Sequence, residues 1–204
     1  MAGTRSRIEQ ALIATAAVLD STTAGWVVVG RIALAVRGVR TVRTSIAVLV
    51  RGDAVEVAQL ASTFACAGFS GRIPEAVEFA RQRFVLLLRH PALGVDLDVV
   101  FGWTELEHDA IAHATRETFG EVRVPIARAH ELAVLSVMSG LPRDHEAAAA
   151  LLLANPDVDR ARVGTQLAAL AEAADAPELG RGWKAVAQQL EILDRVARPP
   201  KRRR

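Results

Sequence analysis

The stretch that most restricts the fold of this chain is residues 26–51, in which two apolar runs are joined through two glycines. The first run, WVVV, is rich in β-branched residues and ends at Gly30, which is typical of a strand covered on both faces. The apolar residues that follow predict a short helix, and Gly38 ends it. A second apolar run at 46–50 predicts a second strand. This order of elements predicts a domain of mixed α and β structure.

The rest of the chain divides into a part with helices and strands and a part with helices alone. In the first part the predicted helices are 6–20, 54–67 with Asp53 as its cap, and 105–118 with Thr104 as its cap. The predicted strands are 83–90, 95–101 and 121–126, and 70–78 is predicted as a loop. The later predicted helices are 129–139, 143–154, 159–174 and 177–196. We therefore expect an α/β domain over 1–128, a helical domain over 129–198 and a disordered basic tail over 199–204.

Composition restricts the classes of function that are open to the chain. Of the 204 residues 51% are hydrophobic, which supports a sizeable core, and the net charge of only +2 is not that of a dedicated nucleic-acid binder. The basic residues 201–204 could contact nucleic acid through phosphate attraction, or they form a solubilising tail. No apolar run reaches the ~18 residues of a membrane span. The single cysteine, Cys66, is expected to be a small buried hydrophobe, and we expect a cytoplasmic protein with no membrane partner.

Several short motifs follow one another in the order of a known family. They are Gly30, Ala33 and Gly38, then Ala67-Gly68-Phe69, then the strand sequence VDLDVVFG, which carries Asp98. In this order they resemble the minimal nucleotidyltransferase fold, and in particular the AbiEii-type toxin nucleotidyltransferases. The resemblance covers about residues 25–153 and implies a mixed sheet flanked by helices and followed by a C-terminal helical bundle. It also implies a bacterial toxin–antitoxin or phage-defence setting.

The residues that would carry the chemistry of this family are different in the present chain. Nucleotidyl transfer uses two metal ions, and Mg²⁺ prefers carboxylate oxygens as ligands. An Asp-x-Asp pair aims both carboxylates at one site, because residues two apart share one face of a strand. Here that pair is replaced by Ser45-Ile46-Ala47, and the second glycine of the family's turn is Arg31. The chain is therefore interpreted as a degenerate member of the superfamily that has lost catalysis.

Two groups of residues stand out as candidate sites. Asp96 and Asp98 are two residues apart on one predicted strand, so they could bind a metal between them. In the alternative interpretation Asp98 is an ancestral remnant and Asp96 is a turn residue at the end of the strand. The second group either forms an anion or nucleotide pocket at the start of a helix or is a solvated basic face. Its members are Gly30, Arg31, Arg37, Arg40, Arg43 and Ser45. His108 and His113 are five residues apart, so they point in different directions on a helix and do not form a metal-binding pair.

Two main functions follow from these candidates, and a third stays open. The first is a pseudoenzyme that binds a nucleotide or a protein partner in a regulatory role. The alternative is an active metal-dependent nucleotidyltransferase, in which Asp96 and Asp98 are joined by carboxylates from elsewhere, such as Asp53 or a partner chain. Only this alternative requires Mg²⁺ and a nucleoside triphosphate. The third is a nucleic-acid-associated module that acts through the basic tail.

Overall fold

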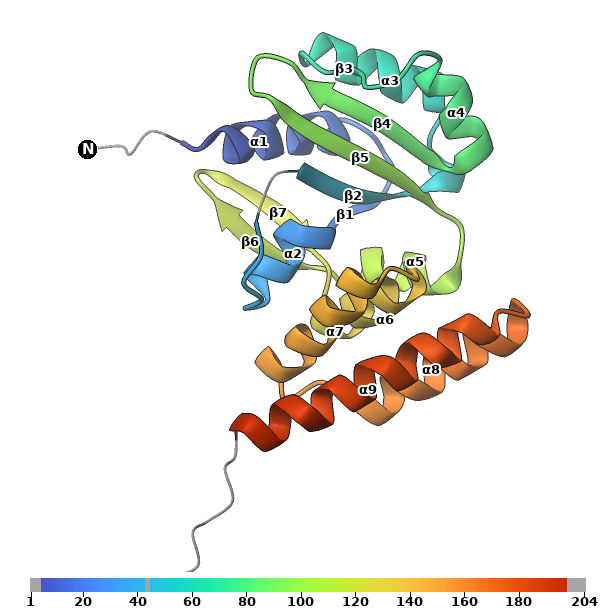
Figure 1. The fold of residues 1–204 in the computed structure, drawn as a ribbon. Coiled ribbons are helices and arrows are strands. Elements are labelled where there is room, and N and C mark those ends of the chain that lie inside the picture. Colours follow the sequence, from blue (N-terminus) through green and yellow to red (C-terminus); the bar gives the residue numbers. More distant parts are fainter. Residues whose placement is uncertain (1–4, 43–44, 198–204) are drawn as a thin grey trace, which may run out of the picture. The chain divides into compact units, whose positions relative to one another are not determined.

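The computed structural model describes residues 5–42 and 45–197, and these form two compact units (Figure 1). The first unit contains the residues up to Ala35 together with 41–128, and the second contains 36–40 together with the residues from Ala129 onward. The short segment 36–40 belongs with the later helices because Asn155 Nδ2 donates a hydrogen bond to the Arg37 carbonyl at 2.9 Å. The predicted tail at 199–204 lies outside the described residues.

A seven-stranded mixed sheet forms the centre of the first unit (Figure 1). Its strands are β1 (Trp26–Val29), β2 (Ser45–Arg51), β3 (Ser70–Gly71), β4 (Val85–His90), β5 (Val95–Gly102), β6 (Thr115–Phe119) and β7 (Val122–Ile126). Their order across the sheet is β3-β4-β5-β2-β1-β7-β6. β2 runs parallel to β5 and β1 runs parallel to β7, while the other neighbours are antiparallel.

On one face of this sheet the central strands β2 and β5 are fully buried, and α1 (Arg7–Asp20) packs against them. On the sheet side, alternate residues of β2 and β5 have no exposed surface, and they are Ile46, Val48, Val50, Leu97 and Val99. On the helix side, Leu12, Ala16 and Leu19 are at most 1% exposed, and α1 contacts β2, β5 and β7. The period of two in the strands and the helical spacing in α1 thus meet in one core.

The opposite face of the same strands is only partly covered. Ala47, Asp96 and Asp98 are of intermediate exposure, although Leu49 on the same face of β2 is 2% exposed. A sheet with one face packed and one face partly open leaves room for a site on the open face. The mixed sheet with its flanking helices, followed by helices alone, confirms the predicted fold class.

The helix predicted at 54–67 begins later than expected and has a different cap. A single 3₁₀ turn, η1 (Gly52–Ala54), comes first, and α3 spans Val57–Cys66. Asp53 does not cap the helix because its carboxylate binds Arg51, at 2.9 Å for the shorter hydrogen bond. The carboxylate of Glu56 caps α3 by accepting from the Ala58 and Gln59 amides at 3.0 and 2.6 Å. Cys66, at the end of α3, is exposed, so the prediction of a buried thiol was wrong.

Two further segments differ from the sequence-based prediction. The predicted loop at 70–78 contains β3 and the start of α4 (Ala76–Arg83), a helix that was not predicted because only Ala80 in it is buried and no apolar periodicity marks it. The helix predicted at 105–118 ends early, as α5 (Glu105–Ala112). The residues after it form β6, which pairs antiparallel with β7. The pairing of β3 with β4 decides the conformation in the first case, and the hairpin of β6 and β7 decides it in the second.

The second unit is built from helices, as predicted. They are α6 (Ala129–Met138), α7 (Pro142–Ala154), α8 (Arg160–Ala173) and α9 (Pro177–Ala197), and α2 (Gly30–Val36) leads into the segment 36–40. Fully buried side chains such as Leu151, Val163 and Val186 form its core. Within the described residues, no helix combines the length and the apolar character that a membrane crossing requires.

Two glycines of this unit give a matched test of its packing. A Cβ added at Gly164 in α8 would lie 2.6 Å from Trp183 Nε1, whereas a Cβ at Gly180 in α9 would meet nothing within 4 Å. We expect Gly164→Ala to lower the free energy of unfolding by about 1–2 kcal/mol, because the overpacking exceeds the gain in helix propensity. Gly180→Ala should raise it by roughly 0.5–1 kcal/mol. Urea unfolding measures both, and an equal stabilisation by the two changes would contradict the close packing of α8 on Trp183.

Candidate functional site

The register of β2 and β5 determines what lies on the open face of the sheet. Ser45 is paired with Asp96 and Ala47 is paired with Asp98. Neighbouring strands are about 4.7–4.9 Å apart, so a carboxylate at either position of β2 would face a carboxylate of β5 directly. The residues that actually stand there are a hydroxyl and a methyl group. The structure therefore brings Ser45, Asp96 and Asp98 together, without a carboxylate on β2.

A side chain that the sequence did not single out binds both aspartates. Arg72 follows β3 directly, and its backbone amide donates to the Leu87 carbonyl at 2.9 Å. Its guanidinium nitrogen Nη2 lies 2.8 Å from Asp98 Oδ1, and Nη1 lies 3.4 Å from Asp96 Oδ2. One guanidinium thus bridges the two carboxylates.

A second arginine completes the charge balance. Arg89 on β4 is paired with Asp96, and its Nη1 donates to Asp96 Oδ1 at 3.1 Å. We call the four side chains Arg72, Arg89, Asp96 and Asp98 the ion cluster; its two cations and two carboxylates balance each other. The side chains of Arg72, Asp96 and Asp98 are only 28–35% exposed, so these pairs are less screened than pairs on the open surface.

The residues of this face do not fit the Mg²⁺ site that the fold family implies. Mg²⁺ needs near-octahedral oxygen ligands, and nucleotidyl transfer needs two such ions. Both carboxylate oxygens of Asp96 and Oδ1 of Asp98 lie within 3.4 Å of an arginine, and Ala47 offers no ligand. Across the described residues no group of three or more His, Cys, Asp or Glu side chains could hold a metal ion.

The glycine turn lies beside the same point of β2. Gly30 has a φ of +62°, and a Cβ added to it would lie 3.2 Å from the Ala47 Cβ, so a side chain here would be strained as well as crowded. Arg31, the next residue, is exposed, and no carboxylate of the described residues pairs with it. Of the other predicted phosphate-binding residues, Arg37 and Arg40 belong to the second unit, and Arg43 lies outside the described residues.

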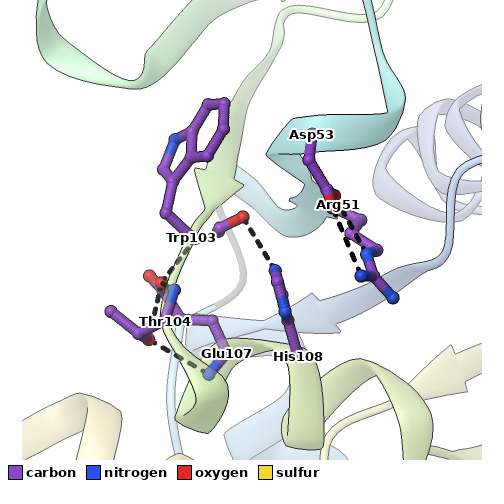
Figure 2. Close-up of polar contacts among 7 residues, drawn as sticks. Arg51, Asp53, Trp103, Thr104, Glu107 and His108 are labelled. Carbon is purple, nitrogen blue, oxygen red and sulfur yellow. Dashed lines mark hydrogen bonds and ion pairs between the residues drawn. The ribbon is translucent and has the colours of Figure 1, made fainter.

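Asp53, named as a possible additional carboxylate, lies at the far end of β2 (Figure 2). Arg51 is paired with Gly102, four positions along β5 from Asp98, so Asp53 is more than about 13 Å along the strand from the ion cluster. Arg51 donates two hydrogen bonds to Asp53, and this bonding lowers the pKa of the Asp53 carboxyl below its ordinary value. Asp53 therefore holds its own cation and does not join Asp96 and Asp98.

The other polar groups at that end support the fold (Figure 2). Thr104 and Glu107 form a capping box at the start of α5, and the Glu107 carboxylate also accepts from the Trp103 amide at 2.9 Å. His108 Nε2 donates to the Gly102 carbonyl at 3.3 Å. His113 Nδ1 contacts the Asp109 carbonyl at 3.0 Å, so the two histidines face different partners.

Arg72 and Arg89 were missed because nothing in their local sequence marks them. Arg72 lies in a segment that the sequence predicts to be a loop, and it is 26 residues away from Asp98 along the chain. Only the pairing of β3 with β4, and of β4 with β5, brings it to the aspartates. The alternation of side chains along β4 would have assigned Arg89 to one face of that strand. That Arg89 lies opposite Asp96 follows only from the register of β4 against β5.

Two solved structures are similar to this chain over most of its length. The solution structure of the antibiotic-resistance factor ANT(2'')-Ia aligns with a TM-score of 0.53 and 14% identity, over 91% of this chain and 96% of that one. The crystal structure of an antigenic nucleotidyltransferase-like protein from Paracoccidioides brasiliensis aligns with a TM-score of 0.50 and 16% identity, over 88% and 93%. No protein-family model and no curated protein sequence matches the chain. At these identities the likeness shows the fold alone, and that fold is nucleotidyltransferase-like.

The bridging role of Arg72 can be measured through stability. We expect Arg72→Ala to lower the free energy of unfolding by about 1–2 kcal/mol, because it removes two charge-assisted contacts and leaves two carboxylates facing each other. Arg81→Ala is the matched control, since Arg81 also contacts two carboxylates but is 52% exposed, and it should cost less than about 1 kcal/mol.

A double-mutant cycle separates the charge of Arg72 from its bulk. In an Asp96→Asn/Asp98→Asn background the cost of Arg72→Ala should fall below about 0.5 kcal/mol, because the repulsion between the carboxylates is gone. An unchanged cost in urea unfolding would mean that Arg72 stabilises the sheet through packing instead of charge.

Proposed function

We propose that this protein is a non-catalytic member of the nucleotidyltransferase fold that works by binding, and that its ligand is the phosphate portion of a nucleotide, held without a metal ion. One observation carries the proposal. The Arg72 guanidinium bridges Asp98 and Asp96 at 2.8 and 3.4 Å, on the face where this fold would otherwise need carboxylates free for metal. A side chain of the protein supplies the positive charge in place of an ion.

The same observation argues against turnover. In a two-metal mechanism the ions clamp the attacking and the leaving oxygens. A guanidinium can donate hydrogen bonds to phosphate, but it offers no open coordination position for an attacking hydroxyl. With Ala47 and Ser45 opposite the aspartates, β2 offers no carboxylate that would help a metal ion to displace Arg72.

The balance of charge favours an anion as the ligand. The ion cluster is neutral in itself. Arg31 follows Gly30, which lies against Ala47, and it has no carboxylate partner among the described residues, so this part of the sheet carries one cation in excess. Guanidinium groups match phosphate oxygens in shape and keep their charge at any physiological pH. The Ser45 hydroxyl has no hydrogen-bond partner among the described residues and could donate to a phosphate oxygen.

Several finer statements stay predictions. They are the AbiEii-type relationship, the toxin–antitoxin or phage-defence setting, a bacterial source, a cytoplasmic location, a protein partner and contact with nucleic acid through the tail. None of them is needed for the binding proposal, which depends on the first unit alone.

Calorimetry with the four nucleoside triphosphates, with Mg²⁺ and with EDTA, tests the proposal. We expect binding that does not require Mg²⁺. Asp98→Ala should leave it intact or tighten it, because the change removes a negative charge from an anion site. Arg31→Gln should weaken it about 10-fold or more, the loss expected for one charge-assisted contact. Arg83→Gln is the control, since Arg83 is also exposed and has no ion pair among the described residues.

A loss of triphosphate binding in Asp98→Ala would support the alternative function. Mg²⁺-dependent binding that disappears in this variant would show that Asp98 holds a metal, and the active nucleotidyltransferase would then be the better interpretation. No binding of any triphosphate under either condition would overturn the nucleotide proposal and leave a protein partner as the ligand to look for.

A reconstructed metal site gives an independent check. The triple change Ser45→Asp/Ala47→Asp/Arg72→Ala places carboxylates opposite Asp96 and Asp98 and removes the bridging cation. We expect this variant to bind Mn²⁺ at least about 10-fold more tightly than the natural sequence, as measured by electron paramagnetic resonance. Arg81→Ala should change nothing. Equally tight Mn²⁺ binding by the natural sequence would contradict the claim that Arg72 takes the place of the metal.

A further inference from the structure

A cavity of about 340 Å³ lies in the first unit, at the end of β1 away from the ion cluster. It is lined by the last residues of α1 and α5, by the first residue of β1, and by Arg116 of β6 and Pro125 of β7. Trp26 begins β1 and pairs with Val50, whereas the ion cluster lies level with Ala47 near the other end of that strand pair. The cavity is therefore a separate site.

The residues buried behind this cavity are apolar, but most of the surface that faces it is polar. Leu19 and Trp26 are 0% and 6% exposed, and Ile111 and Pro125 complete the wall. The Trp26 indole is held by a hydrogen bond from Nε1 to Asp20 Oδ1 at 2.9 Å. A volume of about 340 Å³ is at the small end of the range of about 300–1,000 Å³ that small-molecule sites occupy, and the polar lining suits a small polar ligand.

Two opposite charges line the same cavity without pairing. Asp20 uses only Oδ1, for the Trp26 indole, and Arg116 makes one hydrogen bond, from Nη1 to the Arg123 carbonyl at 3.3 Å. Neither forms an ion pair with any described residue, although the chain has many such pairs on its surface. Asp20 Oδ2 and the Arg116 guanidinium can therefore both form hydrogen bonds to a ligand in this cavity.

The helix ends add to the negative side of the cavity. Asp20 is the last residue of α1, and Ala112 is the last residue of α5. The C-terminal end of a helix carries a partial negative charge, so both helix ends favour a cation in this cavity. An ammonium group is suited to this end, and an anionic group is suited to Arg116.

We propose that this cavity binds a small zwitterion of the amino-acid type. Its ammonium group would donate to Asp20 Oδ2, its carboxylate would accept from Arg116, and its side chain would lie beside Ile111. A nucleoside triphosphate does not suit the cavity, because Asp20 and two helix C-termini would repel its phosphates. The site would give the protein a second ligand, independent of the nucleotide proposal.

The Trp26 indole N–H gives a direct readout of binding. It produces one of three tryptophan indole signals in a ¹H–¹⁵N correlation spectrum, and Trp26→Phe assigns it. The probes are L-leucine, L-phenylalanine and L-glutamine at up to 20 mM. We expect at least one of them to shift the Trp26 signal in a saturable way and to leave the signals of Trp103 and Trp183 unchanged. For the amino acid that binds, the N-acetyl derivative and the amide should each bind at least 10-fold more weakly, because each lacks one of the two charges.

Variants of the two charged residues complete the test. Asp20→Asn keeps an oxygen for the Trp26 indole but removes the negative charge, and Arg116→Gln removes the positive charge. Each variant should bind the amino acid at least 10-fold more weakly. Asp109→Asn on α5 and Arg123→Gln on β7 are the controls and should bind as the natural sequence does. No saturable Trp26 shift with any probe, equal binding of the amide and the free amino acid, or unchanged binding in Arg116→Gln would each overturn the proposal. The dispersion of each variant's spectrum shows that it is folded.

Discussion

The parallel pairing of β2 with β5 is the contact on which the rest of the candidate site depends. Its register puts Ala47 beside Asp98 and Ser45 beside Asp96, on the face that α1 leaves uncovered. Two carboxylates on a partly buried face repel each other unless a cation lies close to them. β2 supplies no such cation, so it comes from the other side of β5, through Arg72 after β3 and Arg89 on β4.

A guanidinium and a divalent ion meet the same electrostatic need in different ways. A metal ion can exchange, can bind substrate oxygens and can be lost, whereas Arg72 is attached to the backbone and remains in place. Its backbone is also held in the sheet, through the hydrogen bond from its amide to Leu87. A fold that keeps its aspartates with an internal cation can therefore remain stable without a metal. This is the physical basis on which we favour binding over turnover.

Much of the fold could be predicted from local patterns, and the failures have different causes. The β-branched run before Gly30 and the strand that carries Asp98 were recognised because a buried strand has a distinctive composition. The helices after residue 129 were recognised from their caps and apolar residues. By contrast α4, with a single buried residue, has no such pattern, and β6 is a strand only because it pairs with β7. Asp53 was misread as a helix cap because Arg51, two residues earlier, competes for its carboxylate.

The sequence by itself determined that β2 carries a serine and an alanine where the family that this chain resembles has carboxylates. It also determined that Asp96 and Asp98 share one face of a strand, because the alternation of side chains is a local property of an extended chain. Only the tertiary structure decided what neutralises those aspartates. Arg72 and Asp98 are 26 residues apart, and their contact depends on the order and register of three strands. The same is true of the cavity between Asp20 and Arg116. Hydrogen-bond register between distant segments is set by the whole core, and no local pattern encodes it.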